Sequence, residues 1–197
     1  GGTAPNMVQS HAKVRYMMRA PEAPEVQALR ERVDKIAQGA AMMTETKVSW
    51  NVVSAYSNLI TIPTLQATAN LAMHDIPLPM PTEEELAFGH QIQKTMVLTD
   101  EQRSKPPFAM EVLEPAPAVA HGGSTDTADV SWNCPTVQMH IGNWVIGTPG
   151  HSWQSTSQCK YSYAKRAMLY AGKAVAQTIM RLMAEPALIE KARQEHT

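Results

Sequence analysis

The chain has 197 residues, of which 44% are hydrophobic and 18% are charged, so it is globular and long enough to bury a core. Its formal net charge of -1 and its scattered charges exclude the basic surface of a nucleic-acid-binding protein. No apolar run reaches the roughly 18 residues of a membrane span, and Cys134 and Cys159 form no disulfide framework, so we expect a cytoplasmic protein.

The sequence pattern of residues 1–60 predicts a strand, a helix and a second strand. Apolar and polar residues alternate over 11–19, which is typical of a half-buried strand. Pro24 then begins a helix, because apolar residues recur at helical spacing as far as residue 44. Alternation returns over 47–56 with β-branched and aromatic residues. We therefore expect half of a split βαβ sandwich, with helices on one face of a small antiparallel sheet.

Residues 61–197 predict several helices, with the longest near the end of the chain. Shorter helices are expected over 64–75, from a capping box of Thr82 and Glu85 to about Met96, over 99–102, and from Pro186. The longest helix covers 160–183, and its periodicity predicts a buried stripe made of Ala164, Ala167, Met168, Ala171, Val175, Ile179 and Leu182.

The stretch 121–154 concentrates the residues that could carry chemistry. It contains three of the seven histidines and a Gly-rich turn, and it alternates turns with two short apolar runs that we expect to be strands. His151 follows the second run in the sequence G-T-P-G-H-S-W-Q. A histidine on a turn at a strand end can reach a metal or ligand with little rearrangement. The alternative is a surface-loop histidine that bonds its neighbours.

Gly123 opens a polar loop that continues with Ser124, Thr125 and Asp126. Glycine lets the backbone approach a ligand closely, and the following side chains offer two hydroxyls and a carboxylate. The alternative is a plain polar turn. A binding loop and a simple turn have the same local pattern, so both interpretations stay open.

Other polar residues of the same stretch have more ordinary explanations. Asp129 is a metal or supporting group or, more simply, the end of a loop. His140 alternates within the second apolar run, which favours a buried core histidine over a ligand. His121 is ambiguous. Cys134 and Cys159 have no neighbouring group that would activate a thiol, which favours buried and inert cysteines.

Four segments in order resemble one known family. They are the opening G-G-T-A-P-N-M-V, the alternating H-A-K-V-R-Y-M-M-R-A, the loop G-G-S-T-D-T-A-D-V-S-W-N-C-P-T, and G-T-P-G-H-S-W-Q. Together they resemble the aminobenzoyl-glutamate utilisation B group of the amidohydrolase and metallopeptidase family, which includes carboxypeptidase G, aminoacylase and succinyl-diaminopimelate desuccinylase. The likeness runs essentially from end to end.

The resemblance implies an α/β fold with two domains. Residues 1–60 are expected to be the second half of an α+β, ferredoxin-like lid and dimerisation domain. Residues 61–197 are expected to be the C-terminal part of the metallopeptidase-like α/β catalytic domain. We expect a homodimer, or a heterodimer with a related subunit, formed through the lid. The charge pattern and the lack of a long apolar run give no reason to expect a nucleic-acid or membrane partner. The family's catalytic domain holds two divalent metal ions, zinc or manganese.

The resemblance also assigns roles to individual residues. His151 lies in the H-[ST]-x-[EQ] setting of the family's last metal ligand. Asn6 and Arg19 match the lid asparagine and lid arginine, which are expected to bind the substrate's carboxylate or amide. A guanidinium suits a carboxylate because it donates two parallel hydrogen bonds. Gly123, Ser124, Thr125 and Asp126 match the loop on the substrate side.

The remaining family motifs have no counterpart in these residues. The H-x-D motif, the bridging Asp, the Glu-Glu pair with the general base, and the fourth ligand all precede the lid in the family. The chain also opens at Gly1 without Met and enters a strand-like pattern at once, so we expect part of a longer protein, although a processed or tagged chain would look alike. We expect these 197 residues alone to bind no metal and to have no activity.

Three functions follow from these observations. The first is part of a metal-dependent amidohydrolase that hydrolyses the amide bond of an N-acyl amino acid, with an aminobenzoyl-glutamate-like amide as substrate. The second is a non-catalytic association module in which the lid strands pair with another copy. The third is a degenerate family member whose metal site has been lost. The sequence upstream of Gly1, and metal analysis of the natural product, would separate them.

Overall fold

The computed structural model describes residues 4–115 and 123–196, and its contacts divide the chain into two compact units. Unit 1 comprises Gly1–Leu59 and Val119–Asp129, and unit 2 comprises Ile60–Ala118 and Val130–Thr197. These units rest on contacts alone, so the identity of 1–60 as half of a lid and of 61–197 as part of a catalytic domain stays a prediction.

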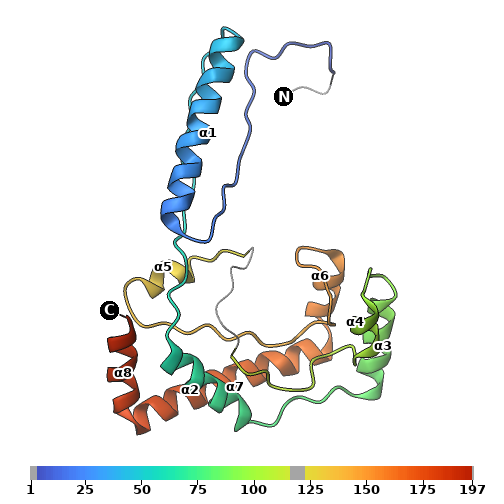
Figure 1. The fold of residues 1–197 in the computed structure, drawn as a ribbon. Helices are drawn as coiled ribbons and strands as arrows, with labels where there is room; N and C mark the ends of the chain where they lie inside the picture. Colours follow the sequence, from blue (N-terminus) through green and yellow to red (C-terminus); the bar gives the residue numbers. More distant parts are fainter. Residues whose placement is uncertain (1–3, 116–122, 197) are drawn as a thin grey trace. The chain divides into compact units, whose positions relative to one another are not determined.

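Unit 1 is built on helix α1, Ala23–Met43. The helix begins with a capping box between Glu22 and Glu25, with Pro24 in its first turn, and its bounds confirm the predicted helix. Extended chain runs along α1 both before and after it (Figure 1). Val14 and Val48, one from each side, line the same hollow as the apolar face of the helix.

The two strands predicted beside this helix are not formed. Segments 11–19 and 47–56 are extended but have no assigned strand, and no strand is assigned anywhere within residues 4–115 and 123–196. A strand needs backbone hydrogen bonds to a neighbouring strand, whereas alternation of side chains only specifies two faces. The prediction of strands was therefore wrong, and the α/β class is not confirmed: the described residues form helices and irregular chain.

Unit 2 is organised along the longest helix, α7 (Figure 1). Helix α2 packs against both α7 and α8, and α6 packs against α7. The helices predicted from 64, 82, 99 and 186 are confirmed within a few residues. The helices of this unit are α2 Pro63–His74, α3 Glu83–Gln93, α4 Asp100–Ser104, α6 Trp153–Cys159, α7 Ser162–Ala184 and α8 Pro186–His196.

The two apolar runs of the central stretch are also not strands. The first overlaps the short helix α5, Thr127–Ser131, and the second, 137–146, is irregular. Short apolar runs do not distinguish a strand from a helix or from buried irregular chain, because each hides apolar side chains equally well.

The face of α7 that is buried differs from the predicted stripe. Met168, Val175 and Ile179 are exposed, whereas Ala164 and Ala167 are buried as expected. Apolar residues occupy more than one face of this helix, so periodicity alone does not choose the inner face. Small side chains let α2 approach the helix closely. The buried face consists of Tyr163, Ala164, Ala167, Tyr170, Ala174 and Thr178.

Two apolar clusters form the core of unit 2. One contains residues Ile62 and Leu65 of the α2 region with Ala192 of α8. The other joins α3 and the segment after it to the first turn of α7, and it contains Ile92, Met96, Leu98, Phe108, Val145 and Tyr163. None of the helices in the described ranges combines the length and apolar character needed to cross a membrane.

A buried carboxylate ties α3 to α7. Glu85 is only 2% exposed and accepts hydrogen bonds from the Ser162 hydroxyl at 2.6 Å and from the Thr82 backbone N–H at 2.8 Å. Its second oxygen also pairs with the Arg166 guanidinium. The predicted capping box of Thr82 and Glu85 is therefore confirmed, and its carboxylate has a second task between helices.

Candidate functional site

The loop that carries His151 is held by close packing on one side. Gly147 has φ 86°, in the left-handed region that favours glycine. A Cβ built on Gly147 would lie 2.4 Å from Cδ2 of Leu98, which is closer than any side chain permits. The hydroxyl of Thr148 donates to the Val145 carbonyl oxygen at 2.6 Å and closes the turn. This turn therefore cannot shift without moving the core.

Gln158 of α6 fixes the other side of the loop. It is only 2% exposed, and its Oε1 accepts a hydrogen bond from the Val145 N–H at 2.7 Å. Its Nε2 donates to the Thr148 hydroxyl and to the Gln154 carbonyl oxygen, both at 3.0 Å. A buried amide that satisfies both of its ends orders its surroundings. The loop is thus a rigid platform.

His151 lies on this platform with its side chain exposed. Its φ of 57° is left-handed, which is uncommon for a residue with a Cβ. The next residue, Ser152, is the N-cap of α6, and its hydroxyl accepts from the Ser155 N–H at 3.2 Å. The imidazole is therefore presented at the surface by an ordered backbone, as a ligand at a strand or helix end requires.

The predicted loop 123–126 lies in unit 1 and leads into α5. Gly123, Ser124 and Asp126 are exposed, and Thr125 is half-buried. The Thr125 hydroxyl donates to Asp126 Oδ1 at 3.3 Å and accepts from the Thr127 N–H at 3.3 Å. The loop therefore forms a hydrogen-bonded turn, and its polar groups face solvent.

Asp129 stabilises this part of the chain. Its Oδ1 accepts a hydrogen bond from the Ser57 backbone N–H at 2.9 Å, 72 residues away in the sequence. Its N–H donates to the Asp126 carbonyl oxygen at 3.0 Å. These contacts support the structural interpretation of Asp129 as the residue that ends and anchors the loop.

The two predicted lid residues are both on the surface of unit 1. Asn6 is exposed and lies within a turn that the Met7 N–H closes by donating to the Ala4 carbonyl oxygen at 3.2 Å. Arg19 is exposed, and its Nε and Nη2 lie 3.2 and 3.1 Å from the sulfur of Met17. A thioether is a weak acceptor, and this contact places the Nε and Nη2 edge of the guanidinium beside Met17.

The predicted site residues fall into two sets. Asn6, Arg19 and the loop 123–126 belong to unit 1, and His151 belongs to unit 2. That these sets converge on one substrate stays a prediction. Within residues 4–115 and 123–196 no group of three or more His, Cys, Asp or Glu side chains could hold a metal ion. A single imidazole is too few ligands for the predicted dinuclear centre.

Three other predicted features differ from the structure or lie outside it. His140 is exposed, so its prediction as a core histidine was wrong. Cys134 and Cys159 are also exposed rather than buried. The histidine was placed on a strand that does not form, and the lack of an activating neighbour, from which buried cysteines were inferred, does not determine burial. His121 lies outside the described residues.

Gln158 was missed as a support of the His151 loop, and Gln154 was missed as a link between α6 and the segment after α3. Gln154 is buried, and its Nε2 donates to the Thr95 carbonyl oxygen at 3.3 Å. The two glutamines are four residues apart on α6 and thus share a face of that helix. That spacing next to a turn was the available signal, but it does not identify the partners.

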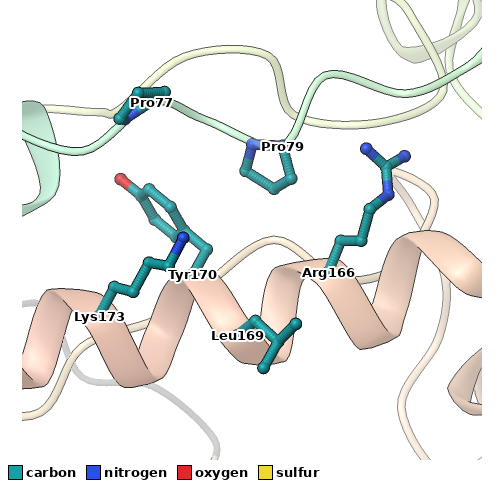
Figure 2. A pocket seen from close by; sticks show the side chains of 6 residues that line it. All are labelled: Pro77, Pro79, Arg166, Leu169, Tyr170 and Lys173. Atoms are coloured by element: carbon teal, nitrogen blue, oxygen red, sulfur yellow. The ribbon is translucent and has the colours of Figure 1, made fainter.

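A small hollow elsewhere on unit 2 contains none of the predicted site residues. Figure 2 shows prolines of the connector after α2 opposite side chains of α7. Its volume is about 240 Å³, below the range of about 300–1,000 Å³ that is typical of ligand pockets. Arg166, at its edge, is already paired with Glu85. The lining residues are Pro77, Pro79, Arg166, Leu169, Tyr170 and Lys173.

Comparisons with known proteins give two relatives. The chain is 39% identical to the B subunit of p-aminobenzoyl-glutamate hydrolase of Escherichia coli (strain K12) over 217 residues, which span 100% of this chain and 45% of the relative. It is 25% identical to the Xaa-Arg dipeptidase of Mus musculus over 197 residues, 99% of this chain and 38% of that protein.

The chain thus spans less than half the length of these two curated relatives. Neither a protein-family model nor a solved structure matches it significantly. The likeness to the bacterial protein nevertheless extends over every segment that the sequence motifs marked, from the opening residues to the loop of His151. The chain belongs to the amidohydrolase and peptidase family that includes the B subunit of p-aminobenzoyl-glutamate hydrolase.

Proposed function

We propose that the protein containing this chain hydrolyses the amide bond of an N-acyl amino acid, with p-aminobenzoyl-glutamate as the leading substrate. Water adds across the amide bond, so that the acyl carbon gains a hydroxyl group and the amino acid leaves with a new N–H. The observation that carries the proposal is the 39% identity over the whole chain to a protein named for hydrolysing that amide.

Each candidate residue has a role in this proposal. Arg19 binds a carboxylate of the substrate, because a guanidinium can donate two parallel hydrogen bonds to a carboxylate and Arg19 matches the family's lid arginine. Asn6 binds a second carboxylate or the amide, since its side chain both donates and accepts. The loop 123–126 offers backbone N–H groups and hydroxyls to the same substrate.

His151 is proposed as one ligand of a two-metal centre of zinc or manganese, as the family resemblance implies. Such a centre would supply an activated water and polarise the amide carbonyl. The described residues do not fit the whole group, because they provide no cluster of three ligands. We therefore assign His151 only its position, an exposed imidazole on an ordered turn, and derive no catalytic step through the metal ions.

The test is hydrolysis of p-aminobenzoyl-glutamate by the complete protein, followed by chromatographic separation of p-aminobenzoate and glutamate. We expect His151→Ala to abolish both turnover and bound metal, measured by elemental analysis. His140→Ala is the matched control, because His140 is also an exposed histidine of unit 2. Retained turnover in His151→Ala would remove it from the ligands. A wild-type protein with neither metal nor turnover would identify a degenerate member.

A second candidate function is association through unit 1. Helix α1 has no buried residue, and the extended segments beside it expose Val14, Tyr16 and Val53. Unpaired extended backbone and exposed apolar side chains favour pairing with another chain. The bacterial relative is named as one subunit of a hydrolase, which supports an assembly of this kind. We propose that unit 1 forms a homodimer or a heterodimer with a related subunit.

Light scattering coupled to size-exclusion chromatography tests this association. Val53→Lys should shift the complete protein toward the monomer, because it introduces charge among the exposed apolar residues of unit 1. Val97→Lys is the control, since Val97 is fully exposed but belongs to unit 2. A wild-type protein that is monomeric alone and stays monomeric when it is mixed with the related subunit would contradict the proposal.

A further inference from the structure

Helix α6 has an inverted distribution of polar and apolar residues. Its buried residues, Gln154, Ser155 and Gln158, are all polar. Gln158 bonds the chain that enters the turn before the helix, and Gln154 bonds the Thr95 carbonyl oxygen after α3. Its largest apolar side chain, Trp153, is 61% exposed. Amphipathic helices ordinarily bury their apolar face. The indole therefore contributes little to the folding of unit 2, although its backbone follows a turn that Gln158 anchors.

Trp153 is also two residues after His151, on the same supported backbone. Both side chains are exposed, and Ser152 between them caps α6. A large flat side chain on a rigid backbone is suited to contact a ligand, because ordering it costs little conformational entropy. Its faces favour another aromatic ring by stacking, whereas an aliphatic group gains only apolar contact.

p-Aminobenzoyl-glutamate, the compound in the name of the bacterial relative, has two chemically different halves. One side of its amide bond is an aminobenzoyl ring, and the other side is glutamate with two carboxylates. Arg19 and Asn6 suit the carboxylates, but neither suits a ring. The residues proposed so far thus leave the aromatic half of the substrate without a partner.

We propose that Trp153 stacks on the aromatic acyl group of the substrate and sets a preference for aromatic over aliphatic N-acyl amino acids. This inference rests on the proposed function. It concerns a residue that contacts the substrate beside His151, and it assigns Trp153 no part in bond cleavage.

The test compares two substrates, p-aminobenzoyl-glutamate and N-acetyl-glutamate, with the complete protein loaded with its metal. For Trp153→Ala, kcat/KM should fall about 10-fold more for the aromatic substrate than for the aliphatic one, which corresponds to the loss of one stacking contact. Trp153→Phe should keep most of the preference, because a phenyl ring also stacks. Val97→Ala is the control, as a fully exposed apolar residue of unit 2 truncated in the same way.

The outcomes separate the two proposals. If the wild-type protein turns over both substrates and Trp153→Ala leaves the ratio of their kcat/KM values unchanged, the stacking role alone is overturned. A thermal midpoint that falls sharply in Trp153→Ala, with equal losses for both substrates, would show that the indole is a packing residue and would also overturn it. If the wild-type protein turns over neither substrate, both the proposed function and this inference are contradicted.

Discussion

Gln158 accepts a 2.7 Å hydrogen bond from the backbone N–H of Val145, and both residues are almost completely buried. This contact joins α6 to the chain that enters the His151 turn, because Val145 lies 13 residues before Gln158 in the sequence. Val145 also belongs to the apolar core formed with α3 and α7. The backbone that leads to the exposed His151 is therefore held by a buried amide of α6.

Replacement of this amide should destabilise unit 2. Gln158→Leu keeps a similar volume but leaves the buried Val145 N–H without an acceptor, so we expect a loss of about 2–3 kcal/mol in the free energy of unfolding. Chemical denaturation would measure it. Gln177→Leu is the control, because Gln177 bonds the exposed Asp75 at 3.1 Å, and its effect should stay below about 0.5 kcal/mol. Equal effects would contradict the anchoring role.

Gly147 gives a second test of the same platform. Gly147→Ala would place Cβ 2.4 Å from Leu98 Cδ2 in a left-handed backbone, so it should lower the free energy of unfolding by about 2–4 kcal/mol. Gly150→Ala is the matched control in the same loop, because its added Cβ would meet no neighbouring group within 4 Å. If Gly150→Ala lowers the thermal midpoint as much as Gly147→Ala does, the packing argument is refuted.

The helices could be predicted because their signals are local. The capping box of Thr82 with Glu85 and the proline at position 186 each specify a helix start within a few residues. The strands could not be predicted in the same way, since pairing requires a partner far away in the chain. Alternation at 11–19 correctly indicated extended chain with two faces, but it contained no information on a ladder.

The site was predictable only in part, for a similar reason. The turn signals around Gly147 and Gly150 indicated that His151 lies on a loop, and its side chain is indeed exposed. The support from Gln158 depends on a backbone N–H that folding brings close, so no short pattern identifies it. His140 was wrongly predicted to be buried because its environment was inferred from a strand that does not form.

The surroundings of Glu85 predict how the free energy of unfolding depends on pH. Burial alone raises the pKa of this carboxyl, but hydrogen bonds from Ser162 and Thr82 and the charge of Arg166 together lower the pKa below its ordinary value of 4.5. A folded-state pKa below the unfolded value means that the stabilisation is complete above about pH 4.5 and is lost as the pH falls through the lower folded-state pKa.

The measurement is the free energy of unfolding of wild type and Glu85→Gln between pH 7 and pH 3. The difference between them should be largest near neutral pH and should shrink below pH 4.5, because the wild-type carboxylate becomes protonated and resembles the amide. Glu83→Gln is the control, as an exposed glutamate of the same first turn. A difference that is independent of pH would show that Glu85 acts by packing and not by charge.

Replacement of Arg19 should weaken substrate binding and leave the chemical step unchanged. A charge-assisted, bidentate contact to a carboxylate contributes about 1.5–3 kcal/mol, so Arg19→Ala should raise KM for p-aminobenzoyl-glutamate by about 10- to 100-fold and leave kcat nearly unchanged. Arg19→Lys should restore only part of the loss, since an ammonium cannot donate two parallel hydrogen bonds. Steady-state kinetics of the complete protein would measure both variants.

Two comparisons separate recognition of a carboxylate from a general effect of charge. Arg15→Ala removes another exposed arginine from the same extended segment and should leave KM unchanged. p-Aminobenzoyl-glutamine replaces one carboxylate of the substrate by an amide, so its KM should respond less to Arg19→Ala if that carboxylate is the partner. A KM that rises equally in both arginine variants, or a loss confined to kcat, would exclude Arg19 as the group that binds the substrate's carboxylate.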